Sequence, residues 1–571
     1  MKKYKALVWV LSILMVFASC KQNSKPEKQV VEKITYNNPI LSGFYPDPSI
    51  CKVGDDYYMV NSSFGYFPGL PIFESKDLVN WNQIGHVLDR NEQLDLTGQG
   101  TSRGLFAPAI SYHNGVYYVV CTNVGYKGNF VVTTTDPKGP WSDPYWLPEL
   151  SGIDPSIFFD EDGKSYIVFN SEAPNNEAMY YGHRTIKLVE FDIESLKVIS
   201  EPKIIVNGGT DLSKEPIWIE GPHLYKKDGW YYLMCAEGGT EWNHSEVIFR
   251  SKSVNGPFES FENNPILTQR NLDKSRPNPI ECTGHADLIE GPNGDWWAVF
   301  LATRPYEGKH FNLGRETFLA PVKWVDGWPI INPDYKEIQY TYTAPLSENK
   351  TIATMPLNGN FVLRHQFDDL HMSWVYLRNP NKDSYELESG KLKVALSPET
   401  VDGNGMTSFI AQRQKSDYGH VMTKMQFEPD AAGEQAGLLL YRNETHYYFM
   451  ALEKNENGEQ TLRLYQKNED DKNLLKSVPI HTAEDELILK VDYKGNTMNF
   501  YYGNSEDALT PLITNVDATI LSTETAGGFV GVMQALYATS NGSESANSAL
   551  FDWFEIKTDN PVYKNLENEV E

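Results

Sequence analysis

The sequence predicts an all-β protein, a five-bladed β-propeller followed by a β-sandwich. Three observations lead to this prediction. One hairpin pattern returns five times in the first half, aromatic residues make up 13% of the 571 residues, and 42 Gly and 33 Pro supply many turns. Aromatic residues favour strands, while Gly and Pro mark the turns between short strands. At roughly 100 to 250 residues per domain, the chain is long enough for two or more domains.

Each copy of the hairpin pattern has a Pro or Ala start, an apolar strand, a Gly-containing turn and an aromatic strand. The copies are residues 45–62, 106–123, 153–170, 219–237 and 283–302. Asn-Gly and Asp-Gly in their turns accept the positive φ that tight hairpins require. A sheet-sized unit repeated in this way is typical of a propeller, whose blades stack radially. We therefore expect the propeller to span residues 36–345.

Polar residues stand at the strand starts of several blades. The first strand of each blade lines the channel of a propeller, so equivalent strand starts meet at one mouth. The residues expected around that pocket are Asp47, Asp154, Glu220 and His285, with Phe106 from the second blade. Carboxylates that face one another raise one another's pKa, which marks functional sites. Glycoside hydrolysis uses such a set, because one carboxylic acid protonates the leaving oxygen and a second carboxylate acts from the opposite face.

The segments around these residues carry a recognisable set of motifs. They are F-Y-P-D-P-S at 44–49, G-I-D-P-S at 152–156 and I-E-G-P-H-L-Y-K at 219–226. These motifs resemble those of glycoside hydrolase family 43. N-L-G-R-E-T at 312–317 and V-K-W-V-D-G-W-P at 322–329 are similar to its branch of β-xylosidases and α-L-arabinofuranosidases. The resemblance implies an inverting exo-hydrolase, in which the two acting carboxyls stand roughly 6.5 to 9.5 Å apart.

The same resemblance implies a role for each matching residue. Asp47 corresponds to the general base that activates water, and Glu220 to the general acid. Asp154 corresponds to a third carboxylate that tunes the pKa of the acid and orients it. Arg315 corresponds to an arginine that binds the sugar, where its fork of donors suits hydroxyl pairs.

His285 and Phe106 complete the candidate site. In related enzymes the histidine matching His285 helps to hold a central ion, often calcium, or a water. The alternative is a structural histidine held by hydrogen bonds. Phe106 directly precedes a strand start, so its ring is expected to contact the sugar. The chemistry itself requires no cofactor, although a structural calcium in the channel fits the resemblance.

Three functions are compatible with these residues. The first is an exo-α-L-arabinofuranosidase that releases non-reducing arabinofuranose from hemicellulose oligosaccharides of arabinoxylan or xyloglucan type. The second is a β-xylosidase on the same scaffold. The third is a non-catalytic carbohydrate-binding lipoprotein, which would be expected to lack one of Asp47, Asp154 and Glu220, and all three are present.

The remaining half, residues 346–571, shows different strands with alternating and β-branched residues, as in a two-sheet sandwich. With the segment G-L-L-L-Y-R-N-E-T-H-Y-Y at 437–448, it resembles the concanavalin-like domain that follows the propeller in many family 43 enzymes. Such a domain either binds carbohydrate or buttresses the propeller, and we favour buttressing.

The N-terminus indicates export. Residues 1–20 have a basic start, an apolar run and small residues before Cys20, which resembles a bacterial lipoprotein signal with Cys20 as the lipidated residue. An ordinary signal peptide with a chance Cys is the alternative. Residues 21–35 form a linker, and K-Q-N-S-K at 21–25 has no acidic group, which favours a lipid anchor facing the periplasm over the cell surface.

The charge restricts the partners. A net charge of −26 and a pI near 4.9 argue against nucleic-acid binding, because affinity for phosphates depends on Lys and Arg. We expect an oligosaccharide substrate, and membrane contact through the lipid anchor only.

Overall fold

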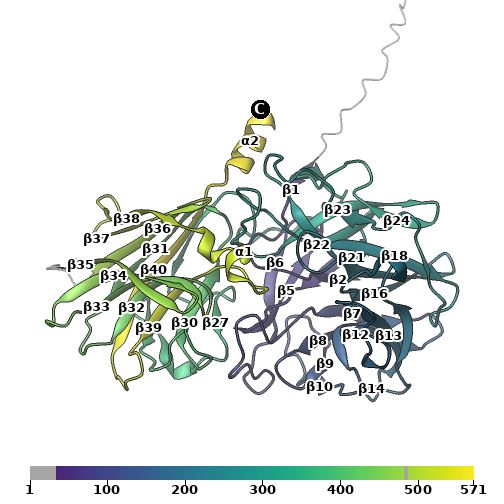
Figure 1. The fold of residues 1–571 in the computed structure, drawn as a ribbon, viewed down its shortest axis with the longest axis horizontal. Coiled ribbons are helices and arrows are strands. Elements are labelled where there is room, and N and C mark those ends of the chain that lie inside the picture. The colour runs from purple at the N-terminus through teal and green to yellow at the C-terminus, as the bar shows by residue number, and fades with distance from the viewer. Residues whose placement is uncertain (1–33, 481–485, 571) are drawn as a thin grey trace, which may run out of the picture.

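Two β-structured parts lie side by side in the computed structural model, which describes residues 34–480 and 486–570 (Figure 1). The N-terminal part is the predicted five-bladed propeller and the C-terminal part is a two-sheet sandwich. The predicted signal peptide, Cys20 and most of the predicted linker lie outside the described residues. Within the described residues, no helix is long and apolar enough to cross a membrane.

Each predicted repeat forms the first two strands of one blade, paired as an antiparallel hairpin. Asn114 and Asp228 in the turns have φ of 49° and 51°, as the Asn-Gly and Asp-Gly pattern predicts. The strands of blades 1 and 2 are β2 (Ser49–Val53), β3 (Asp56–Val60), β5 (Gly69–Ser75), β6 (Asn82–Leu88), β7 (Ala109–His113), β8 (Val116–Asn123), β9 (Gly128–Thr134) and β10 (Tyr145–Trp146). Those of blade 3 are β11 (Gly152–Phe159), β12 (Ser165–Glu172), β13 (Arg184–Asp192), β14 (Lys197–Val198) and β15 (Lys203–Asn207).

Blades 4 and 5 complete the ring. Their strands are β16 (Glu220–Lys227), β17 (Trp230–Glu237), β18 (Ser245–Ser251), β19 (Glu259–Ser260), β20 (Leu267–Thr268), β21 (Glu281–Glu290), β22 (Trp296–Thr303), β23 (Glu316–Val325) and β24 (Trp328–Ile331). Strand β1 (Thr35–Asn37) pairs with β25 (Thr341–Thr343), and Leu41 forms a bridge with Thr317 of the last blade. The start of the propeller is therefore held against its end.

The sandwich consists of two large antiparallel sheets. One contains β26 (Val362–Gln366), β28 (Tyr385–Glu388), β29 (Lys391–Ala395), β31 (Tyr418–Gln426), β36 (Glu486–Lys494), β37 (Thr497–Gly503), β38 (Thr510–Asp517) and β40 (Ser548–Thr558). The other contains β27 (Val375–Leu377), β30 (Ser408–Arg413), β32 (Gln435–Asn443), β33 (His446–Lys454), β34 (Gln460–Asn468), β35 (Asp471–Pro479), β39 (Met533–Thr539) and, from the propeller, β4 (Tyr66–Phe67). Because β4 follows blade 1 strand β3, the two parts share a sheet.

The helices are few and short. They are α1 (Thr523–Ala526), α2 (Pro561–Val570) and the 3₁₀ turns Pro174–Asn176, Leu212–Lys214, Lys382–Ser384 and Thr519–Leu521.

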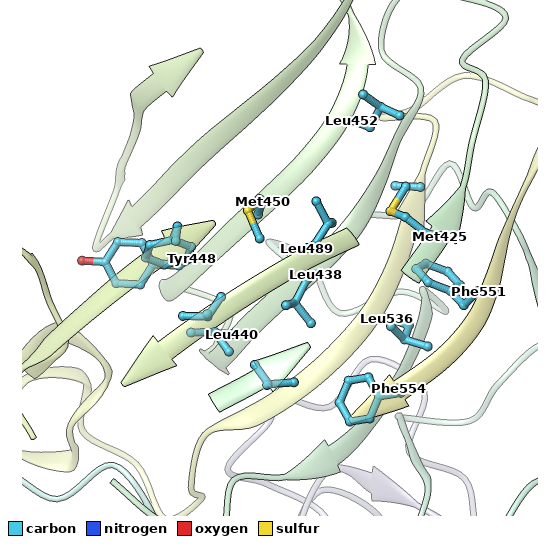
Figure 2. Packing of buried hydrophobic residues seen from close by; sticks show 14 of the residues in the cluster. Met425, Leu438, Leu440, Tyr448, Met450, Leu452, Leu489, Leu536, Phe551 and Phe554 are labelled. Carbon is cyan, nitrogen blue, oxygen red and sulfur yellow. The ribbon is translucent and has the colours of Figure 1, made fainter. Parts of the chain in front are cut away.

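The central strands of the sheet nearer the propeller, β30, β32, β33 and β39, are buried on both faces. Figure 2 shows Leu438, Leu440 and Met450 among the side chains that fill the space between the two sandwich sheets. The alternate residues Leu439 and Tyr441 belong instead to a cluster with Phe44 and Phe64 of the propeller. Burial on both faces explains the unbroken apolar runs of β32 and β33. The sandwich thus packs against the segment that leads into Asp47.

Candidate active site

One cavity of about 400 Å³ brings together all the side chains that the sequence pointed to in the propeller. It is lined by Asp47, Asp154, Glu220, His285, Arg315 and Phe106, among others. These residues come from all five blades, at or close to the starts of the first strands, or, for Arg315, just before β23. The radial repeat therefore brings together residues that are far apart in the chain.

Irregular backbone directs these side chains into the cavity. The pairing of the first two strands shifts register around Asp154, Glu220 and His285. Such bulges re-aim side chains that strict alternation would send to the other face. Asp47, Asp154 and His285 also adopt a left-handed φ of 53°, 53° and 50°. Non-glycine residues in this region are strained by roughly 1 to 3 kcal/mol each, which is a feature of functional sites.

Glu220 is offset from the other residues by one position. The left-handed residue before the Pro of blade 4 is Gly221, with φ of 56°, so Gly221 and not Glu220 is equivalent to Asp47 and Asp154. Glu220 nevertheless lines the cavity, as the sequence predicts, from the position before this glycine. An added Cβ on Gly221 would lie 2.9 Å from the ring of His285, so this position requires glycine for space as well as for conformation. Because of this offset, Glu220 is the first residue of β16 and lies one position before the left-handed residue of its blade.

Asp47 is buried and held in its ionised form. Its Oδ1 accepts a hydrogen bond of 2.7 Å from Nη1 of Arg315, and its Oδ2 accepts one of 2.5 Å from Oγ of Ser62. Burial alone would raise the pKa of Asp47, but Arg315, His285 and the Ser62 hydrogen bond outweigh it, so the pKa lies below the ordinary value. The carboxylate therefore stays charged at neutral pH.

The pKa values of Asp154 and Glu220 are shifted in the opposite direction, upward. Burial and then the charge of Asp47 raise the pKa of Glu220 to about 7, against the opposing effect of Arg315 and Arg184. Burial and the charges of Glu220 and Asp47 raise the pKa of Asp154 well above its ordinary value. Because ionisation of either carboxyl makes ionisation of the other harder, this pair keeps a proton near neutral pH. The backbone N–H of Gly221 donates to Oδ2 of Asp154 at 3.2 Å and favours the charge there.

A wall of three phenyl rings closes one side of the cavity, and one of them comes from the sandwich. The ring centroid of Phe64 lies 5.1 Å from that of Phe106 and 5.8 Å from that of Phe529. Phe529 follows α1, and its carbonyl oxygen accepts a hydrogen bond of 3.3 Å from Nη2 of Arg315. The sandwich therefore supplies part of the site, which the sequence analysis did not assign to any residue.

Arg184, Glu172 and Trp218 also line the cavity and were missed. The Arg184 guanidinium carbon lies 4.8 Å from the ring centroid of Trp218, and Arg184 forms an ion pair with Glu172. Trp218 stands two residues before Glu220, close enough to the motif to be suspected. Arg184 has no nearby motif. Phe529 lies in a glycine-rich segment at 527–531, and this was the one feature of the sequence that could have drawn attention to it.

His285 lies beside Asp47 but in surroundings unlike a calcium site built by the protein. Its Nδ1 is 3.9 Å from Oδ1 of Asp47, and burial lowers the pKa of His285 to about 4, so the ring is neutral at neutral pH. Calcium takes six to eight oxygen ligands. The nearby carboxylate of Asp287 already accepts hydrogen bonds from Ser49 and Tyr225. Among the described residues, no group of three or more His, Cys, Asp or Glu is arranged to hold a metal. An ion here would have to take most of its ligands from water.

An ionised carboxylate and a protonated carboxyl in one cavity, with donors and aromatic rings around them, fit the chemistry of a glycoside hydrolase site. Comparison with known proteins agrees. The model "Glycosyl hydrolases family 43" matches residues 36–329, and "Beta xylosidase C-terminal Concanavalin A-like domain" matches residues 364–557. The chain belongs to glycosyl hydrolases family 43 and is a glycosidase with a concanavalin-like C-terminal domain.

Two curated relatives extend over nearly the whole chain. A xylosidase/arabinosidase of Butyrivibrio fibrisolvens is 40% identical over 91% of this chain and 99% of its own length. A non-reducing end alpha-L-arabinofuranosidase of Bacteroides ovatus is 38% identical over 92% of this chain and 95% of its own.

Solved structures show the same architecture. A Bacteroides ovatus GH43B described as belonging to a xyloglucan PUL has a TM-score of 0.81 at 37% identity, covering 92% of this chain and 99% of its own. A xylan beta-1,4-xylosidase from Bacillus halodurans has a TM-score of 0.83 at 33% identity, covering 92% of this chain and 100% of its own.

Proposed function

We propose that the protein is an exo-acting, inverting α-L-arabinofuranosidase that releases non-reducing terminal arabinofuranose from hemicellulose oligosaccharides. Asp47 is the general base that takes a proton from the attacking water. Glu220 is the general acid that protonates the leaving oxygen. Asp154 tunes and orients that acid, and Arg315 and Phe106 bind the sugar.

The observation that supports this function best is the contrast between two carboxyls of one cavity. The pKa of Asp47 is lowered and that of Glu220 is raised to about 7. Near neutral pH one group is ready to accept a proton and the other to donate one, which is the requirement for acid and base in glycoside hydrolysis. A cavity of about 400 Å³, closed on one side by the phenyl wall, favours attack at a chain end over attack within a polymer.

The proton of the Asp154–Glu220 pair is assigned to Glu220. The Gly221 N–H that donates to Asp154 favours the ionised form of Asp154, although burial still raises the pKa of that carboxyl, so the pair shares one proton and the I-E-G-P motif assigns its transfer to Glu220. When Asp154 is ionised, its charge adds to that of Asp47, which raises the pKa of Glu220. The reaction consumes one water and uses only side chains for proton transfer. We expect EDTA to leave kcat unchanged, and a loss restored by Ca²⁺ would instead give an ion near His285 a role.

The second candidate is a β-xylosidase, which several relatives' names support. Arabinofuranose and xylose place similar hydroxyls near one carboxyl set, so the cavity accommodates either. Rates on 4-nitrophenyl α-L-arabinofuranoside and 4-nitrophenyl β-D-xyloside decide between them. A faster arabinofuranoside supports the first proposal, a much faster xyloside supports the second, and cleavage of neither would leave a carbohydrate-binding protein.

We also propose that the chain is exported and anchored by a lipid on Cys20, facing the periplasm. The support is the sequence of residues 1–25 alone. Cys20→Ala in the full chain is expected to move the protein from the membrane to the soluble fraction. Retention of Cys20→Ala in the membrane would count against a lipid at that residue, and digestion by protease added to intact cells would place the protein on the cell surface.

A further inference from the structure

A second polar cavity lies between the propeller, the sandwich and the C-terminal helix. Its volume is about 310 Å³, and it shares no lining residue with the candidate active site. The propeller contributes Arg304, Tyr306 and Tyr340 to its lining. The sandwich contributes Asp417 and Tyr418, immediately before and at the start of β31.

Asp417 is the unusual member of this lining. It is only 7% exposed, yet its Oδ1 is fully buried and has no hydrogen-bond partner among the described residues. An unpartnered buried carboxylate oxygen is unfavourable by roughly 1 to 3 kcal/mol or more. Burial raises the pKa of Asp417 to about 7, with Arg304 opposing the shift. This carboxyl therefore requires a group that donates to it.

Two tyrosines add further polar groups to the cavity. Tyr340 and Tyr418 both belong to its lining, and a tyrosine hydroxyl can donate or accept a hydrogen bond. Arg304 is buried and lies close enough to Asp417 to affect its pKa, but the two do not form an ion pair. A hydroxyl group that accepts from Arg304 or a tyrosine and donates to Asp417 would satisfy these groups together.

The charges indicate a neutral ligand. The Arg304 guanidinium is already neutralised by Glu316, with hydrogen bonds of 2.6 and 2.8 Å. The nearby Arg276 forms ion pairs with Glu281 and Glu337. The remaining cation of the lining, Lys274, has its ammonium group 4.4 Å from the ring centroid of Trp242, and the acidic Glu307 also lines the cavity, so the charges do not favour an anion. What remains is a mixture of donors, acceptors and aromatic rings, which suits a polyhydroxylated molecule.

We propose that this interdomain cavity is a second binding site for a neutral sugar unit, held by Asp417, Tyr418, Tyr340 and Arg304. This proposal rests on the proposed function in one respect only, the choice of hemicellulose sugars as probes. The site is separate from the chemistry, so changes at Asp417 leave hydrolysis of small nitrophenyl substrates unaltered.

Hydrogen–deuterium exchange on the full chain tests this proposal. The Glu220→Gln enzyme, which holds sugars without turning them over, is measured with xylobiose, with L-arabinose and with inorganic phosphate. Both sugars are expected to slow exchange severalfold in residues 338–342 and 415–420, as well as around residue 220. Adding Asp417→Asn or Tyr418→Phe should abolish protection at 338–342 and 415–420 but keep it around residue 220. Asp471→Asn, at an exposed position on β35, is the matched control and should keep both.

The outcomes separate this site from the proposed function. Protection at the cavity without protection around residue 220 would support the second site while contradicting the catalytic proposal. Protection around residue 220 alone would overturn the second site, as would cavity protection that survives both Asp417→Asn and Tyr418→Phe. Protection of the cavity by phosphate and not by sugars would overturn the assignment of a neutral ligand. Tyr418→Phe removes only one oxygen atom and is expected to fold. If Asp417→Asn does not fold, Tyr418→Phe alone still tests the second site.

Discussion

Arg315 donates a hydrogen bond of 2.7 Å to Oδ1 of Asp47, and both side chains are buried. The same guanidinium donates to the carbonyl oxygen of Phe529 in the sandwich. A residue of the propeller therefore keeps the base ionised, and a backbone group of the second domain holds that residue in place. An added Cβ on Gly314 would lie 2.9 Å from the backbone nitrogen of Gly531, so the two domains meet closely beside Arg315.

Replacing Arg315 by Met is expected to raise the pKa of Asp47, because the first cause that lowers it is lost. A hydrogen bond between charged groups contributes about 1.5 to 3 kcal/mol, so kcat/KM should fall about 10- to 100-fold. The acidic limb of the pH profile should move to higher pH, since the base must be ionised to act. Arg103→Met, which also changes an arginine lining the cavity, serves as control. An unmoved acidic limb in Arg315→Met would contradict the role of Arg315.

Glu220→Gln is expected to remove the basic limb of the pH profile. The wild-type acid acts when protonated, so activity should fall as the pH rises through about 7. The loss should be far larger for oligosaccharides than for aryl glycosides with a good leaving group, because nitrophenolate departs without a proton. Glu241→Gln, at an exposed neighbouring position, should behave as wild type. Equal losses on both substrate types would argue against general-acid catalysis by Glu220.

The same substitution should stabilise the protein in alkaline solution. A carboxyl whose pKa is raised in the folded state binds its proton more tightly there than in the unfolded chain. Stability therefore falls as the pH rises from about 4.3, the unfolded value, to about 7, and remains lower above it. Glu220→Gln removes this penalty, on the order of a few kcal/mol at most. Thermal unfolding should show a higher Tm than wild type at pH 8 and little difference at pH 4, and the reverse order would refute the raised pKa.

Arg413 links the sandwich to the segment that carries the base. Its Nε donates 2.8 Å to the carbonyl oxygen of Phe44, and its guanidinium carbon lies 4.5 Å from the ring centroid of Tyr45. Arg413→Met should lower kcat tenfold or more with little change in KM, because small displacements of a catalytic group are costly. Arg413→Lys should restore part of the activity. Arg463→Met, within the sandwich on β34, should change Tm without changing kcat. If Arg463→Met lowers kcat as much as Arg413→Met does, Arg413 acts only through the stability of the sandwich.

Much of the fold was visible in the sequence because the blades repeat. The hairpin turns, the Asp-Pro starts and the aromatic strands are local signals, and they led to Asp47 and Asp154 directly. Glu220 was found by its motif, one position before Gly221, which takes the left-handed position in blade 4. Gly221-Pro222, in place of the Asp-Pro of blades 1 and 3, is the sequence signal of this offset.

The rest of the site depends on contacts between distant parts of the chain. Phe529 is 214 residues beyond Arg315, with which it shares a hydrogen bond. Nothing in the local pattern of either residue indicates the other. The pairing of β4 with β27 is similarly invisible, since Tyr66–Phe67 is too short a strand to be read from alternation. The sequence therefore predicted the candidate carboxyls but not the residues that the sandwich adds to the wall of the cavity.

The central claim is that Asp47 activates water on the face opposite the leaving group that Glu220 protonates. Proton NMR of the first-formed sugar, recorded before mutarotation while the enzyme cleaves an α-L-arabinofuranoside, measures the outcome directly. The account predicts that β-L-arabinose appears first, by inversion at the anomeric carbon. Initial appearance of α-L-arabinose would mean a covalent intermediate and would contradict the role of Asp47 as a base acting through water.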